Sequence, residues 1–149
     1  MAHCLVPAIV EEFVDADGFI FVARGAGLPY AVEGALKFKE LTYRWTEHCP
    51  AGELKHGPLA LVGPGTPVVV VDSGEPKLAG NIAEIAARGG RVITIGTAGA
   101  SVPACGDMSA PWGPLPATVP LQILARELAL ALGRDVDKPR NLAKSVTVE

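Results

Sequence analysis

The chain has 149 residues, of which 49% are hydrophobic and 19% are charged, and its formal net charge is −3. This length is that of one domain, and the apolar fraction is enough to bury a core without disulfides. The negative net charge argues against a nucleic-acid-binding surface, which needs clustered Lys and Arg, and no apolar run approaches the length of a membrane span.

The cysteine content and the N-terminus indicate the compartment. Cys4, Cys49 and Cys105 do not have the spacing of a metal site. An odd number of thiols without such spacing is typical of a reduced intracellular protein, and the N-terminus shows no secretory signal. The sequence therefore predicts a cytoplasmic protein with no bound metal and no cofactor.

The first part of the chain predicts a helix, a buried strand and a glycine turn. Residues 5–14 have helical spacing, and residues 19–23 form a continuous apolar run between glycines, which suits a parallel strand. A glycine turn over residues 25–27 then leads into a long helix. Such a turn can hold an anion, but it offers no Ser or Thr hydroxyl, and Pro29 removes an N–H group. We interpret it as a tight turn, not as a phosphate cradle.

The helix predicted over residues 31–46 has two apolar sides and one charged stripe. The broad apolar face comprises Ala31, Gly34, Ala35, Phe38, Leu41, Thr42 and Trp45. The second apolar edge comprises Val32, Leu36 and Tyr43. The stripe comprises Glu33, Lys37, Glu40 and Arg44, which the helical repeat stacks on one side. Two apolar sides are more than one sheet can cover, so the helix predicts a homodimer or a higher oligomer. The stripe would then face a cleft; a solvated face of Glu–Lys pairs is the alternative that the pattern leaves open.

The rest of the chain alternates strands and helices. Residues 48–57 form a polar connection, and residues 58–62 form a short apolar segment. Further strands are predicted at 66–71 and 91–95, with a weaker one at 104–108, and further helices at 76–88 and 118–132. This order implies right-handed crossovers and an α/β fold of three α/β/α layers, in which a doubly wound, mainly parallel sheet has four to five strands.

Two internal motifs and the end of the chain carry a resemblance to a known family. ALKFKE and AGELKHGPLAL resemble the sugar isomerase (SIS) domain of glucosamine-6-phosphate synthase, the isomerizing glutamine–fructose-6-phosphate aminotransferase. The ending DVDKPRNLAKSVTVE resembles the C-terminal end of that family. The resemblance covers nearly the whole chain. It implies a SIS-type, flavodoxin-like fold, with one SIS domain over residues 1–149 that ends in a catalytic tail over residues 134–149.

The resemblance implies catalytic roles for three residues. Glu40 would move a proton between C1 and C2 of the sugar, His56 would open the sugar ring, and Lys144 would form a Schiff base with fructose 6-phosphate. These residue types suit these roles, because a carboxylate in a water-poor cleft is a general base and histidine transfers protons near neutral pH. A lysine whose pKa is lowered can attack a ketone. On composition alone, a solvated stripe, a structural loop histidine and a solvated tail lysine remain open.

Four further residues match polar positions of the family's site. Glu33 and Lys37 match substrate-binding positions, where Lys37 would hold a hydroxyl group or balance the charge of Glu40. Arg140 and Asn141 are likewise expected to bind the substrate, and they would fix the tail over the cleft. The family contributes the histidine across a dimer interface, so the residues that surround His56 can belong to another subunit.

The chain departs from the family's full enzyme, in which a glutaminase domain precedes two SIS domains. It matches only the last of these, and its start does not match the glutaminase opening. The Ser/Thr phosphate loop of the first SIS domain has no counterpart here. The resemblance thus predicts the C-terminal half of the isomerase unit, with fructose 6-phosphate and glucosamine 6-phosphate as ligands and a first SIS domain and a glutaminase domain as partners. Alternatives are a non-catalytic SIS module that binds a sugar phosphate or dimerises, and a sugar-phosphate deaminase of the same superfamily.

Overall fold

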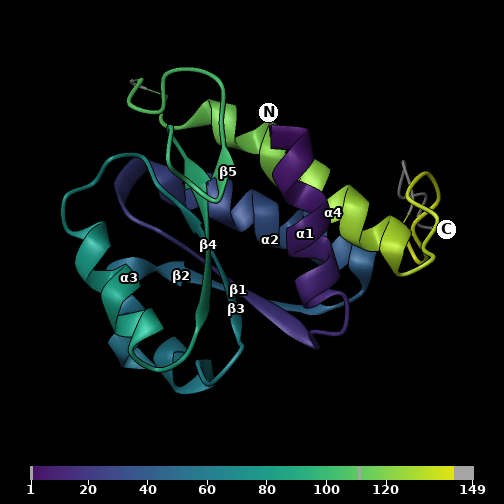
Figure 1. The fold of residues 1–149 in the computed structure, drawn as a ribbon, viewed down its shortest axis with the longest axis horizontal. Helices are drawn as coiled ribbons and strands as arrows, with labels where there is room; N and C mark the ends of the chain where they lie inside the picture. Colours follow the sequence, from purple (N-terminus) through teal and green to yellow (C-terminus); the bar gives the residue numbers. More distant parts are fainter. Residues whose placement is uncertain (1, 111, 143–149) are drawn as a thin grey trace, which may run out of the picture.

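A five-stranded sheet forms the centre of the computed structural model, which describes residues 2–110 and 112–142 (Figure 1). Its strands are β1 (Gly18–Ala23), β2 (Trp45–Pro50), β3 (Pro67–Val71), β4 (Arg91–Gly96) and β5 (Val102–Pro103). They lie in the order β2-β1-β3-β4-β5, and every neighbouring pair is parallel. The predicted doubly wound α/β fold is therefore confirmed.

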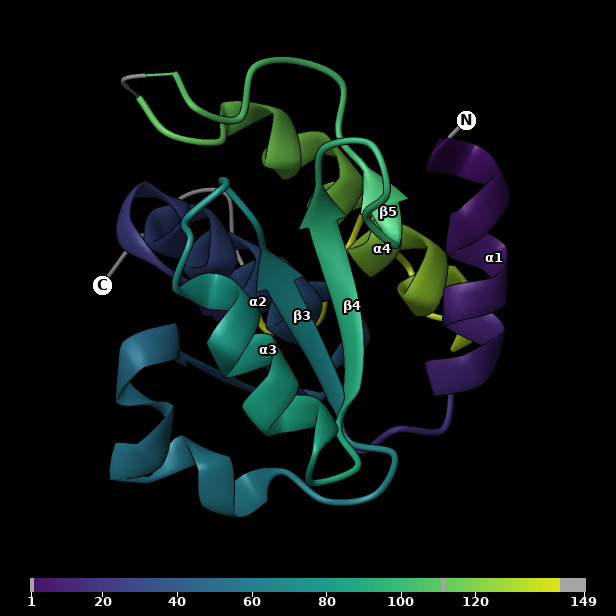
Figure 2. The ribbon, with the colours of Figure 1, turned by 60° about the vertical axis from the view of Figure 1, so that its left-hand side comes forward.

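Helices cover both faces of the sheet. One face carries α1 (Ala2–Phe13), α2 (Leu28–Thr42) and α4 (Thr118–Ala131). The other face carries α3 (Leu78–Ala86) and the 3-10 segments η2 (Ala51–His56) and η3 (Pro58–Leu61), as the turned view in Figure 2 shows for α1 and α3. Short 3-10 turns, η1 (Gly25–Gly27) and η4 (Leu115–Ala117), precede α2 and α4. Within the described residues, every helix is too short or too polar to cross a membrane.

The strands separate two apolar cores, because successive side chains of a strand point to opposite faces. Phe19 and Phe21 of β1 face α2, where each ring lies 5.0 Å, centroid to centroid and edge-on, from the ring of Phe38. The alternate residues of β1 face the second core, which includes Leu54 of η2 and Ile85 of α3. The segments η2 and η3 are thus held on the face opposite α2.

Two boundary predictions are wrong. The long helix ends at Thr42 and not at residue 46, and the segment predicted as a polar connection begins with strand β2. Trp45, predicted on the apolar face of the helix, starts β2 and is 85% exposed. An edge strand has a neighbour on one side only, so β2 lacks the continuous apolar run that marks the buried strands. The fourth strand predicted at residues 104–108 is also misplaced, since β5 covers Val102–Pro103.

Candidate functional site

The rotation of α2 about its own axis is fixed by a tight crossing with α4 and β1. The predicted broad face is buried at Ala31, Gly34, Ala35, Phe38 and Thr42. A Cβ atom on Gly34 would lie 2.8 Å from Cδ2 of Leu121 in α4 and 3.2 Å from Cε1 of Phe21 in β1. The absence of a side chain at residue 34 therefore lets three elements meet, and this contact sets the direction in which the charged stripe points.

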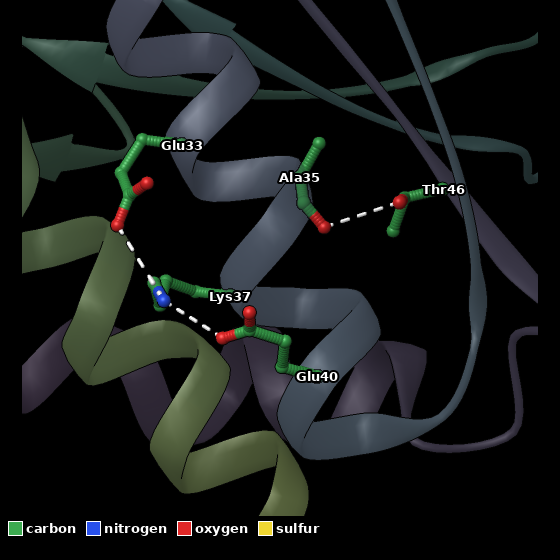
Figure 3. A network of polar contacts seen from close by, with 5 residues as sticks. All are labelled: Glu33, Ala35, Lys37, Glu40 and Thr46. Atoms are coloured by element: carbon green, nitrogen blue, oxygen red, sulfur yellow. Dashed lines mark hydrogen bonds and ion pairs between the residues drawn. The ribbon is translucent and has the colours of Figure 1, made fainter. Parts of the chain in front are cut away.

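Three charged side chains of α2 form one cluster beside that crossing. Nζ of Lys37 lies 2.7 Å from Oε2 of Glu40 and 3.7 Å from Oε1 of Glu33 (Figure 3). The side chains of Lys37 and Glu40 are 29% and 27% exposed. Arg44, predicted as the fourth member of the stripe, lies beyond the end of α2, where its guanidinium donates to the carbonyl of Val14 at 3.3 Å. The part of the stripe that lies on α2 is thus an ion-paired group, partly withdrawn from water.

The cluster determines the charge of Lys37. Its hydrogen bond to Glu40 raises the pKa of Lys37 above the ordinary value of 10.5, burial opposes this, and the negative charges of Glu40 and Glu33 add to the rise. Lys37 is therefore an ammonium group at neutral pH. It can donate hydrogen bonds or balance a carboxylate, but it cannot supply the neutral amine that attacks a carbonyl group.

His56 lies on the other face of the sheet from this cluster. It ends η2, which is anchored in the second core by Ala51 and Leu54. Its side chain is 74% exposed, and Nε2 lies 3.8 Å from Oε2 of Glu53. Because the sheet lies between α2 and η2, the described part of a single chain does not bring Glu40 and His56 into one pocket.

The beginning of the predicted tail meets the C-terminal end of α2. The backbone N–H of Arg140 donates to the hydroxyl of Tyr43 at 3.0 Å. The guanidinium carbons of Arg140 and Arg134 lie 4.3 Å and 5.0 Å from the centre of the Tyr43 ring. Asn141, the next residue, has a φ of 60°, and Lys144 lies outside the described residues. The pattern of the sequence showed Tyr43 only as part of an apolar edge, so these contacts were not predicted.

The glycine turn lies where the strand order reverses, at the carboxyl ends of β1 and β3. Doubly wound proteins usually bind ligands in this crevice. Here a carboxylate oxygen of Glu75 lies 2.9 Å from the position that a Cβ of Gly25 would occupy. On the same side, Nη1 of Arg24 donates to Oδ1 of Asn81 at 3.0 Å. A carboxylate over the turn disfavours a bound phosphate, which agrees with a tight turn and not with a phosphate cradle.

A cavity of about 450 Å³ lies at the other end of the sheet, where strands β1, β2 and β3 begin. It is lined by the first residues of three strands, among them Gly18, Trp45 and Pro67, and by Leu61 of η3. None of the predicted site residues lines it. Parallel sheets bind ligands at the carboxyl ends of their strands, so we do not assign the chemistry to this cavity.

Known proteins resemble the chain in sequence and in fold. The profile of the SIS domain family matches residues 12–105. Isomerizing glutamine–fructose-6-phosphate aminotransferases from Thermus thermophilus and Leifsonia xyli are 47% and 51% identical over 97% and 91% of the chain. The chain spans about a quarter of the length of these relatives (26% and 24%).

Two solved structures extend this comparison. The C-terminal domain of glucosamine-fructose-6-phosphate aminotransferase from Francisella tularensis is 38% identical with a TM-score of 0.75, over 93% of this chain and 43% of that one. Glucosamine-6-phosphate deaminase from Thermotoga maritima is 29% identical with a TM-score of 0.80, over 99% and 45%. The chain therefore belongs to the SIS domain family, and it is homologous to the isomerase portion at the C-terminal end of glutamine–fructose-6-phosphate aminotransferases.

Proposed function

We propose that this chain is the C-terminal half of the isomerase unit of a glutamine–fructose-6-phosphate aminotransferase, and that it binds fructose 6-phosphate and glucosamine 6-phosphate. The observation that supports this most strongly is the arrangement on α2. The helix carries the Glu33–Lys37–Glu40 cluster, and the tail starts against the C-terminal end of the same helix. One element thus joins the two parts of the chain for which the resemblance implies catalysis.

Glu40 is the proposed base. Its carboxylate removes a proton from C1 of the open-chain ketose or its imine, and the electron pair of that C–H bond forms the C1–C2 double bond. As this bond forms, the electron pair of the C2 carbonyl or imine moves onto its oxygen or nitrogen, which takes up a proton. Glu40 then delivers a proton to C2 while the C1 hydroxyl loses its own to become the C1 carbonyl, which gives the aldose form; Glu40 can exchange its proton with the solvent between these steps. The ammonium group of Lys37, 2.7 Å from Oε2 of Glu40, fixes the position of the carboxylate. Glu33 holds Lys37 from the other side and, with it, lines the substrate position.

Lys144 is the proposed nucleophile. Its neutral amine attacks C2 of fructose 6-phosphate, and loss of water leaves the imine. Lys37 does not fit this role, because its pKa is raised by the neighbouring carboxylate. Arg140 and Asn141 precede Lys144 in the tail and set its path.

His56 is proposed to act on a substrate bound to another subunit. It opens the sugar ring by moving a proton from the anomeric hydroxyl group to the ring oxygen. Its exposed position on the face opposite α2 fits a homodimer in which each chain completes the site of its partner. A first SIS domain supplies the phosphate-binding loop in this proposal, and a glutaminase domain supplies the amino group.

One observation favours a second candidate for the chain on its own. The carboxylate of Glu75 lies beside the glycine turn, and a negative charge there disfavours a phosphate at this turn. A non-catalytic module that only binds a sugar phosphate weakly or dimerises would show the same feature. The likeness to the Thermotoga maritima deaminase supports a third candidate, a sugar-phosphate deaminase.

Isotope exchange distinguishes the two catalytic candidates from the non-catalytic module and tests the role of Glu40. The chain, mixed with a first SIS domain and fructose 6-phosphate in D₂O, is expected to exchange a sugar C–H proton. Glu40→Gln should lower this rate by about 10²- to 10⁴-fold, the usual contribution of a general base. Glu11→Gln changes an exposed carboxylate of α1 and is the matched control. Equal exchange by both variants would contradict the role of Glu40.

Borohydride reduction tests the nucleophile. Fructose 6-phosphate should be trapped on a peptide that contains Lys144, and Lys144→Ala should abolish the trapping. Trapping on another lysine would refute the assignment. A chain that binds the sugar phosphate in calorimetry, yet neither exchanges protons nor is trapped, would be the non-catalytic module.

A further inference from the structure

We propose that Tyr43 is a positioning residue that holds the start of the C-terminal tail, at Arg140, against the end of α2, and that the reactivity of Lys144 depends on this contact. This inference rests on the proposed function for the role of Lys144. The tether itself involves only described residues, so it can be tested separately.

The side chain of Tyr43 contacts the tail in two chemically different ways. Its hydroxyl accepts a hydrogen bond from the backbone N–H of Arg140 at 3.0 Å, across 97 residues of sequence. Its ring lies under the guanidinium groups of Arg140, at 4.3 Å, and Arg134, at 5.0 Å, both within cation–π range. The hydroxyl fixes the main chain of the tail, and the ring fixes two of its side chains.

The segment between α4 and Arg140 is itself held by local hydrogen bonds. The N–H of Arg134 donates to the carbonyl of Ala129 at 2.9 Å, which closes the end of α4. Oδ1 of Asp135 accepts from the N–H groups of Asp137 and Lys138 at 3.0 Å and 3.1 Å. The path of the tail is therefore fixed by α4 at its start and by Tyr43 at Arg140, four residues before Lys144.

The backbone of Tyr43 indicates that its side chain has a specific use. Tyr43 caps α2 in the left-handed conformation, with φ of 60° and ψ of 23°, and its N–H donates to the carbonyl of Lys39. Glycine or asparagine is favoured at this position of a helix end, since a Cβ atom is strained there. A tyrosine held in this conformation is over-determined by its surroundings. Here those surroundings include the tail, and Glu40 lies in the last turn of the same helix.

Hydrogen exchange of single amides tests the tether in the full chain. In Tyr43→Phe, which keeps the ring and loses only the hydroxyl, protection of the Arg140 amide should fall by about five-fold, as expected for one hydrogen bond. Asparagine tolerates the left-handed backbone, so in Tyr43→Asn the Arg140 amide should lose more protection, because the ring contacts are lost as well. Tyr30→Phe is the matched control, because Tyr30 is also on α2 and its hydroxyl donates to the Trp112 carbonyl, at 2.6 Å. Unchanged protection of Arg140 in Tyr43→Phe would overturn the inference.

The rate of borohydride trapping on Lys144, with a first SIS domain present, tests the consequence. Tyr43→Phe should lower the maximal trapping rate several-fold with little change in the fructose 6-phosphate concentration for half-maximal rate, because the lost contact affects the attack of the nucleophile more than the binding of the sugar. A wild-type rate in Tyr43→Phe, with Arg140 protection lost, would overturn the positioning role and leave the proposed function standing. If the wild-type chain itself is not trapped at Lys144, the proposed function fails, and the positioning role fails with it.

Discussion

Replacing Gly34 by alanine tests how α2 is held in the orientation that the site requires. The added Cβ would lie 2.8 Å from Cδ2 of Leu121 and 3.2 Å from Cε1 of Phe21. Leu121 is 1% exposed and Phe21 is fully buried, so neither side chain can move into solvent. The added methyl group must therefore displace α4, tilt α2 or force an unfavourable rotamer.

Two opposing effects decide the magnitude. Alanine is better than glycine in a helix interior by about 1 kcal/mol. Inserting a methyl group into a well-packed core costs about 1–3 kcal/mol. The expected net loss in the free energy of unfolding is therefore about 1 kcal/mol, and for a chain of this size it lowers the melting temperature by about 2–4 °C.

The control is Gly80 in α3, where an added Cβ meets no atom within 4 Å. Gly80→Ala should stabilise the protein by about 0.5–1 kcal/mol, because only the backbone effect remains. Urea denaturation with an unchanged m-value measures both variants. If Gly34→Ala stabilises the protein as much as Gly80→Ala does, the crossing has room, and the argument for the orientation of α2 is wrong.

Two further predictions follow from the pKa shifts. The raised pKa of Lys37 means that its stabilising contribution is complete below pH 10.5 and is lost as the pH rises through the higher pKa of the folded state. Lys37→Met should therefore lower the free energy of unfolding by at most about 1 kcal/mol at pH 7, and this loss should shrink above pH 10.5. Urea titrations measure the loss, with Lys39→Met, a change at an exposed lysine, as the control. A loss that grows with pH would contradict the prediction. Burial, followed by nearby carboxylates, raises the pKa of the Cys49 thiol to about 11. Iodoacetamide at pH 8 should modify the exposed Cys105 well before Cys49, and equal rates by peptide mass spectrometry would refute this.

Most of the sheet was predictable because its central strands are buried on both faces. The strands predicted at residues 19–23, 66–71 and 91–95 match β1, β3 and β4 to within one residue at every boundary. Strand β2 was not predictable in the same way. Its sequence, Trp-Thr-Glu-His-Cys-Pro, has the mixed polarity of a loop, and the helix before it ends at a tyrosine in the left-handed conformation, where no glycine marks the end.

In the candidate site, the contacts within one helix were predictable and the contacts between distant parts of the chain were not. The Glu33–Lys37–Glu40 cluster is a consequence of helical spacing, so the sequence predicted it before the structure placed it. The contact between Tyr43 and Arg140 depends on how α2 and α4 cross, and no local pattern encodes it. The position of His56 likewise depends on which core takes up Leu54, which a loop sequence does not reveal.

The separation of Glu40 and His56 restricts how any reaction could use both. A group that transfers a proton must lie within hydrogen-bond reach of its substrate, about 3 Å, or act through one water molecule. With the sheet between them, the two residues of one chain cannot meet this condition for one sugar. A second chain would satisfy it by bringing its own His56 to the α2 surface, where Val32 and Leu36 are 36% and 42% exposed. Covering those apolar side chains would also remove water from the adjacent Lys37–Glu40 pair and strengthen its electrostatic interactions. The exposed apolar edge of α2 predicts an oligomer, and the proposed chemistry requires one. Both place the second chain against α2.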